Sequence, residues 1–404
     1  MNSPDHPSKG SALGDQYFLT AAVALLSAVY MFSPLTSYVG ALLYLTLFSR
    51  RLSTRVRVAT SVIAILSGAS IWSSRQVGLN VSDDFMWYYG VYSSVDTVDW
   101  TDRIPVYEVG LPLFFKILSL ALPGLTPNGL MFVSTTVTGL ILLFCVERFG
   151  VREFPREKRA YCVAMVFLFF SFVLTTQLTR QMLSSVLLVN VFFGLRAASR
   201  RLSLLLASAF HLSALAVYAI LRTFQSRFLL LPFLLVSVVA LAKVVDVQAA
   251  APFITDQAPR VAYYLYLTSS DSGANWAALA IVLGVAVTGL MSLLILKAAN
   301  AEVSSREKQT LALLVGVIII YLLTLDVMLG PFRLFLVVHA VMAGWFFAYF
   351  TRRFPSVYLL LGGAGLIITR SLFLINPTSS FVPWDVYGPF SALPGYFMQS
   401  YLSR

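Results

Sequence analysis

The sequence predicts an all-α polytopic membrane protein with about 11 transmembrane helices. Of its 404 residues, 58% are hydrophobic and only 12% are charged, whereas soluble globular proteins carry about 25% charged residues and roughly 45–50% apolar ones. The mean hydropathy is +0.80, which leaves too little polar surface to cover a water-soluble protein. This composition excludes a soluble cytosolic enzyme, a disordered chain and a nucleic-acid-binding domain, although the formal net charge is +11.

Apolar runs long enough to cross a bilayer recur along the chain, and about 20 residues suffice for a hydrocarbon core of about 30 Å. We expect residues 1–404 to form one integral membrane domain. The first two spans share a turn at Ser33-Pro34, because proline can begin a helix but disrupts its interior. The expected spans are residues 16–32, 34–49, 57–73, 128–146, 160–177, 181–195, 228–244, 276–296, 309–327, 334–350 and 355–373.

The basic residues predict how these spans are oriented, since Lys and Arg mark cytoplasmic loops. The N-terminal segment with Lys9 and six basic clusters with their flanking residues hold 20 of the 29 Lys and Arg residues but only 7 of the 18 Asp and Glu residues. Those seven acids are Asp5, Asp15, Glu147, Glu153, Glu157, Glu302 and Glu307. We therefore expect a cytoplasmic N-terminus and an external C-terminal tail, residues 374–404. The clusters lie at residues 50–57, 148–159, 196–201, 222–227, 297–308 and 352–353.

One apolar stretch, residues 202–221, conflicts with the alternation of cytoplasmic and external loops that these clusters predict. The basic clusters on both sides of it favour the cytoplasm, yet the stretch is long enough to cross once. Either it is a re-entrant pair of short helices that folds back near His211, or Arg222 and Arg227 face outward. We favour the re-entrant pair, because it also places the acidic, tyrosine-rich loop 245–275 outside.

A large external loop, residues 74–127, follows the third span. Within it, residues 109–122 are apolar but too short to span, so we expect them at the membrane interface. Interfaces are themselves enriched in Tyr and Trp, but rings interleaved with carboxylates also suit a carbohydrate, whose hydroxyls need acceptors and whose apolar faces stack. These loop residues are Asp83, Asp84, Trp87, Tyr88, Tyr89, Tyr92, Asp96, Asp99, Trp100, Asp102, Tyr107 and Glu108.

Four arginines fall at or inside the ends of apolar runs. A charge at the bilayer centre costs about 2.5–3.5 kcal/mol, so such residues usually face the protein interior or a wet cavity. Arg75 and Arg370 are long enough to snorkel to the headgroups. Arg180 and Arg333 have polar neighbours in the sequence, among them Gln181, and are the stronger functional candidates.

The histidines and cysteines limit the chemistry further. His211 and His339 lie in apolar runs, where a histidine is more often a packing residue. An interruption of the helix at His211 would place its imidazole at the tip of a helical hairpin and favour a functional role. Cys145 and Cys162 are expected to be packed, reduced thiols. The sequence has no phosphate-binding glycine loop, no H-E-x-x-H and no cysteine–histidine metal set. We expect no cofactor and no metal.

Several short motifs follow one another along the chain. Arg75 closes the third span, and Asp84, Tyr88 and Tyr92 open the large loop, with Asp83 as an alternative to Asp84. An E-V-G element follows, then an R-Q pair at the entrance to a span, then L-A-S-A-F-H-L-S-A-L over residues 206–215 and an arginine before a late span. This order resembles the EpsG family of Wzy-type polysaccharide polymerases, although Phe replaces the Tyr of its G-x-D-Y-x-x-Y element.

The resemblance implies a glycosyltransferase in the bacterial inner membrane with its active site facing the periplasm. It would move a nascent O-antigen, exopolysaccharide or capsule chain from undecaprenyl diphosphate to another undecaprenyl-diphosphate-linked oligosaccharide. Its partners would be membrane lipid and a chain-length regulator protein, and no nucleic acid. In this family a bound metal is not generally needed.

The reaction indicates roles for the charged residues. A departing diphosphate needs cations, and arginine offers a forked, permanently charged set of donors. An acceptor hydroxyl needs a carboxylate or imidazole as general base. The catalytic candidates are Asp84, Glu108 and His211, and the substrate-binding candidates are Arg75, Tyr88, Tyr92, Arg180, Gln181, Arg260 and Arg333.

Three other functions stay open from the sequence. One is another polyprenyl-phosphate-sugar-dependent membrane transferase, in which Asp83-Asp84 could hold a divalent metal. The second is an O-antigen ligase, which differs in its acceptor. The third is a flippase or transporter of lipid-linked sugars. Transporters often contain internal repeats, and no convincing repeat relates residues 1–200 to 201–404.

Overall fold

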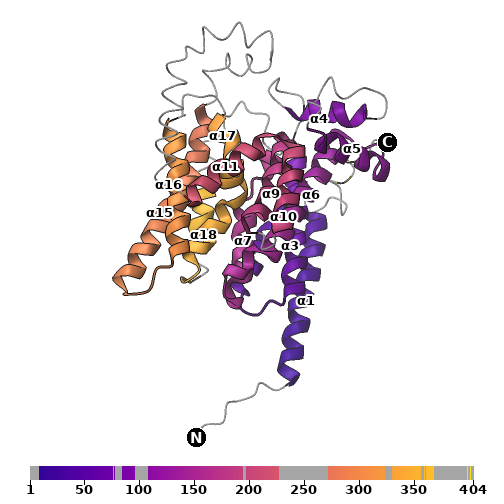
Figure 1. Cartoon of the computed structure of the whole chain (residues 1–404). Helices are drawn as coiled ribbons and strands as arrows, with labels where there is room; N and C mark the ends of the chain where they lie inside the picture. Colours follow the sequence, from indigo (N-terminus) through magenta and orange to yellow (C-terminus); the bar gives the residue numbers. More distant parts are fainter. Residues whose placement is uncertain are drawn as a thin grey trace.

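Figure 1 shows the computed structural model of the chain, a bundle of helices in which every secondary-structure element of the described residues is helical. This confirms the predicted all-α class. The structure describes residues 9–75, 77, 84–95, 108–193, 197–226, 272–323, 330–355, 359, 361–367, 398 and 401. The expected span 228–244, Arg260, most of loop 245–275 and most of the tail 374–404 lie outside these residues.

The helices follow the apolar runs closely, with two clear exceptions described below. In chain order they are α1 (Lys9–Phe32), α2 (Pro34–Leu47), α3 (Thr54–Ser73), α4 (Asp84–Ser93), α5 (Gly110–Ala121), α6 (Pro127–Arg148), the 3₁₀ turns η2 (Gly150–Glu153) and η3 (Arg156–Lys158), α7 (Arg159–Phe169), α8 (Phe172–Gln177), α9 (Thr179–Phe193), α10 (Ala197–Phe210), α11 (Ser213–Ser226), α15 (Ser272–Ala298), α16 (Ser305–Leu323), α17 (Gly330–Leu334), the π-helical turn η4 (Val337–Met342) and α18 (Ala343–Thr351).

Three helical segments in the described chain are long and apolar enough to cross a membrane: Thr54–Ser73, Pro127–Glu153 and Asn275–Ala298. Shorter apolar helices stand beside them, so a multi-pass membrane protein is supported, while the number of 11 spans stays a prediction. These shorter helices are Leu19–Phe32, Pro34–Leu47, Gly110–Ala121, Ser213–Arg222 and Val337–Thr351.

The helix starts are set by local capping residues. The side chains of Ser33, Ser53 and Thr126 accept hydrogen bonds from backbone N–H groups in the first turns of α2, α3 and α6. Such caps satisfy donors that have no partner within the helix. Pro34 and Pro127 occupy the first turns of α2 and α6, which confirms the predicted turn at Ser33-Pro34.

Helix α7 lies at the centre of the core, where it packs against α2, α18 and η4. Both cysteines are buried and free, as predicted.

Two of the predicted spans are interrupted. The span 160–177 is broken between α7 and α8. The backbone N–H of Ser171 donates to the Ala340 carbonyl in η4, with 3.0 Å between N and O. The predicted span 334–350 is likewise interrupted, because η4 replaces regular α-helix at that contact.

As we expected from the sequence, residues 202–221 do not form a single span. Helix α10 ends at Phe210 and α11 begins at Ser213, so the predicted break near His211 is confirmed. Whether the pair re-enters the same membrane face stays a prediction. Helix α9 packs antiparallel along α10, and the Ser184 hydroxyl donates to the Ala207 carbonyl with 2.9 Å between the oxygens.

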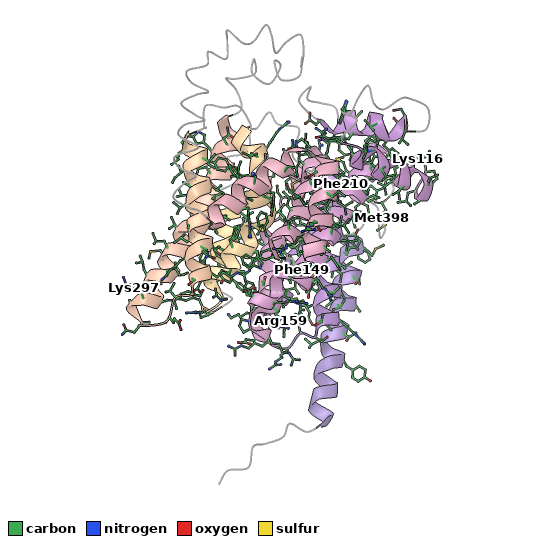
Figure 2. The ribbon with its side chains drawn as sticks, viewed as in Figure 1. Lys116, Phe149, Arg159, Phe210, Lys297 and Met398 are labelled. Carbon is green, nitrogen blue, oxygen red and sulfur yellow. The ribbon has the colours of Figure 1, made fainter. Side chains whose placement is uncertain are left out.

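Three of the predicted basic clusters meet at one end of the bundle. In Figures 1 and 2, α4, α5 and Lys116 lie at one end, and Arg159 and Lys297 lie at the other. At the second end, ion pairs connect three of the basic clusters: Arg306 with Glu153, and Arg352 with Glu307. These three predicted cytoplasmic clusters therefore share an end, although the orientation in a membrane stays a prediction.

Residues 109–122, which we expected at the membrane interface, form helix α5 over Gly110–Ala121, and their location at the interface stays a prediction. The helix buries Leu111, Phe115 and Leu118 and exposes Leu113, Ile117 and Leu120. Its first residue, Gly110, meets the end of α10: a Cβ there would lie 2.9 Å from the Ala209 carbonyl and the Phe210 nitrogen. This close approach brings the loop residue before α5 to the α10–α11 break.

Replacing Gly110 by alanine tests this contact. The added Cβ would force α5 away from α10, and overpacking of this kind costs about 1–3 kcal/mol. We expect Gly110→Ala to lower the thermal unfolding midpoint of the detergent-purified protein by several degrees in scanning fluorimetry. Gly365→Ala is the control, because a Cβ at Gly365 meets no atom within 4 Å. An unchanged midpoint in Gly110→Ala would contradict the close approach.

Candidate active site

Glu108, the residue two before α5, connects three separate segments of the chain. Its carboxylate is buried. One carboxylate oxygen, Oε2, accepts a hydrogen bond from the Arg180 guanidinium at the start of α9. The other, Oε1, lies 2.8 Å from His211 Nδ1 and 3.0 Å from the Leu212 backbone nitrogen, both at the α10–α11 break.

These contacts determine the charge of Glu108. Burial by itself raises the pKa of the carboxyl group, but the hydrogen bond from His211, the charge of Arg180 and the Leu212 N–H together outweigh burial and lower the pKa below 4.5. Glu108 is therefore ionised at neutral pH. Since an ionised carboxylate only accepts hydrogen bonds, the proton between the two side chains is on His211 Nδ1.

The second ring nitrogen of His211 then faces the remaining part of the site. His211 Nε2 lies 3.3 Å from the Gln181 side-chain nitrogen. Gln181 is 7% exposed, and its Oε1 has no hydrogen-bond partner among the described residues. In neutral His211 with its proton on Nδ1, Nε2 carries the lone pair. This is the arrangement of a general base held by an acid partner.

Arg180 faces α4 as well as Glu108. Its Cζ lies 5.9 Å from the centre of the Trp87 ring, within the range of a cation–π contact. One turn earlier on α4, Asp84 pairs with Arg333, with 3.3 Å between Oδ2 and Nη2. Residues i and i+3 share a helix face. The first turn of α4 therefore contacts both arginines, which are far apart in the sequence.

The other predicted site residues lie in the protein interior. Arg75 is fully buried, and it donates through Nε to the Thr176 hydroxyl at 3.0 Å and through Nη2 to the Thr176 carbonyl at 2.9 Å. The expectation that Arg75 snorkels to headgroups is therefore wrong. Tyr88 and Tyr92 are 3% and 6% exposed, because residues 85, 88 and 92 form the inward face of α4. Their rings pack in the core, and the predicted role of both tyrosines in substrate binding stays a prediction.

Trp87, which the sequence places among the loop rings that suit a carbohydrate, is a site residue missing from the predicted substrate-binding set. Its position three residues after Asp84 was the available signal, because helical spacing places the two side chains together. His339 lies in η4, where its Nε2 is 3.0 Å from the Phe332 carbonyl oxygen, as expected of a packing residue. The candidates Arg260 and Asp83 lie outside the described residues.

Comparison with known proteins places the whole site within one family match. The sequence model of the EpsG family matches residues 58–375, more than three quarters of the chain. This range includes all the charged side chains described above, from Asp84 to Arg333. No curated protein and no solved structure matches the chain. The extent of the family match shows that the chain belongs to the EpsG family.

Proposed function

We propose that the protein is a Wzy-like polysaccharide polymerase. It transfers a nascent glycan from undecaprenyl diphosphate to a lipid-linked repeat unit at the periplasmic face of the bacterial inner membrane. Membership of the EpsG family links the chain to exopolysaccharide biosynthesis at a membrane. The observation that carries the proposal is the Glu108–His211 pair, with Arg180 on Glu108 and Arg333 on Asp84 of α4. These residues lie at the α4–α5 end of the bundle, opposite the three ion-paired basic clusters (Figure 1).

In this proposal His211 is the general base. His211 Nε2 takes the proton of the acceptor hydroxyl, while the bond from that oxygen to the anomeric carbon forms. Glu108 holds the Nδ1 proton in place and stabilises the imidazolium. The bond between the anomeric carbon and the diphosphate oxygen breaks at the same time, and its electron pair leaves with undecaprenyl diphosphate.

The arginines stabilise that departing charge. In the structure each guanidinium is balanced by a carboxylate: Arg180 by Glu108 and Arg333 by Asp84. A diphosphate offers more charge and more acceptor oxygens than a carboxylate, so it competes well for a guanidinium. Arg180 also has a buried Nε without a partner among the described residues, which gives it a donor beyond its bond to Glu108.

The Glu108–His211 pair distinguishes this proposal from a transporter of lipid-linked sugars. Moving a lipid across the membrane needs no general base, whereas glycosyl transfer to a hydroxyl does. Asp84 is engaged with Arg333, which supports a role in charge balance over metal binding. An O-antigen ligase would use the same leaving group with a different acceptor, so surface-polysaccharide analysis distinguishes the two.

Substituting Arg180 tests the role of the guanidinium. Removing one such donor typically lowers a rate by about 10²–10³-fold. We expect a deletion strain carrying Arg180→Ala, or Arg180→Lys, which keeps the charge but not the fork, to display single repeat units in place of long polymer on gel electrophoresis. Ligase loss, in contrast, would leave the surface lipid without any repeat unit.

The matched control for Arg180 is Arg306→Ala. Arg306 is an arginine in an exposed ion pair at the opposite end of the bundle, and such pairs contribute little. We expect it to support normal polymer. Immunoblots of membrane fractions check that all variants reach wild-type levels. Long polymer from both Arg180 variants would contradict the proposed role.

The lowered pKa of Glu108 predicts that the stability of the folded protein depends on pH. The pKa of this carboxyl group lies below 4.5 in the folded protein, so the ionised carboxylate stabilises the fold at higher pH, and this contribution is lost as pH falls through the lowered pKa. We expect Glu108→Gln to unfold at a lower temperature than wild type at neutral pH. The difference should narrow below pH 4.5. A difference that stays constant from neutral to acid pH would contradict the ionised pair.

A further inference from the structure

Trp87 lies beside Arg180 and on the same helix as Asp84, so it adjoins one charged pair of the site and shares α4 with the other. It is one helical turn after Asp84, so both side chains leave α4 on the same face. The Arg180 guanidinium approaches the indole from one side, at 5.9 Å from the ring centre. Tyr88 supports the indole edge-on, with ring centres 5.2 Å apart and an interplanar angle of 64°. The ring is held in place and is partly exposed.

The remaining aromatic rings of α4 are already used in packing. Phe85, Tyr88 and Tyr92 are at most 6% exposed. Tyr89 is stacked on Tyr92, and its hydroxyl donates to the Leu125 carbonyl at 3.3 Å. Among the described rings of this helix, Trp87 combines exposed surface with contact to a site arginine.

That combination suits a sugar next to a diphosphate. A pyranose presents an apolar face of C–H groups, and tryptophan offers a large, rigid apolar surface with a polar N–H at its edge. A sugar linked to a diphosphate begins one oxygen atom away from phosphorus. If Arg180 holds the diphosphate, the first sugar must therefore lie beside the ring that Arg180 touches.

We infer that Trp87 stacks on the first sugar of the lipid-linked glycan and so determines specificity for glycosylated lipid over bare undecaprenyl diphosphate. The inference rests on the proposed function, because Arg180 must hold the diphosphate. It has a consequence for turnover: once the glycan is transferred, the leftover lipid loses the stacking contact, so product binds more weakly than donor.

The test compares two probes on the full-length protein in lipid nanodiscs. One is undecaprenyl diphosphate, and the other is the undecaprenyl-diphosphate-linked repeat unit purified from the deletion strain. Trp87→Ala should bind the glycosylated lipid about tenfold more weakly, the upper end of what an aromatic contact contributes, and bind the bare lipid like wild type. Trp87→Phe should recover most of the loss. Met86→Ala, an exposed neighbour on α4, is the control and should bind both probes like wild type.

The outcomes separate the inference from the proposed function. Equal weakening for both probes would overturn the inference, because Trp87 would then act only by supporting Arg180. Unchanged binding of both probes in Trp87→Ala would also overturn it, while leaving the polymerase proposal intact. Wild-type protein that binds neither probe would overturn the proposed function itself.

Discussion

The buried Glu108 carboxylate is the group on which the site depends. A buried charge is costly unless it is paired and hydrogen-bonded, and here one anion is satisfied by a guanidinium, an imidazole and a backbone N–H from α9 and the α10–α11 break. The same requirement therefore fixes the positions of Arg180 and His211. Because Gly110 lets α5 approach α10 closely, Glu108 can reach both. The fold and the chemistry of the site share this single contact.

The fold class and most helices could be predicted because they depend on local features. Apolar runs set helix lengths, and Ser33 and Thr126 cap helices where the sequence suggests a start. The interruptions at Ser171 and in η4 could not be predicted. They depend on a hydrogen bond between the backbone N–H of Ser171 and the backbone carbonyl of Ala340. Almost every residue has these backbone groups, so only tertiary packing determines which two meet. Nothing in either apolar run marks this partnership.

The residues of the candidate site could be predicted from the sequence where a charged or polar side chain falls in an apolar run. Arg180 and His211 stood out because polar groups in apolar runs need partners, but the identity of the partner, Glu108, required the fold. The tyrosines show the opposite case. Motif spacing favoured Tyr88 and Tyr92 as ligand-binding residues, whereas helical periodicity turns both inward and leaves Trp87 beside Arg180. Periodicity within α4 would have separated these residues, had the length of that helix been known from sequence.

The most direct test of the account is a cryo-electron microscopy structure of the protein in nanodiscs with undecaprenyl diphosphate bound. The account predicts diphosphate density within hydrogen-bonding distance of the Arg180 guanidinium, with His211 still bonded to Glu108. Diphosphate bound elsewhere, while Arg180 remains paired with Glu108 as it is in the free protein, would contradict the central claim that this cluster is the active site.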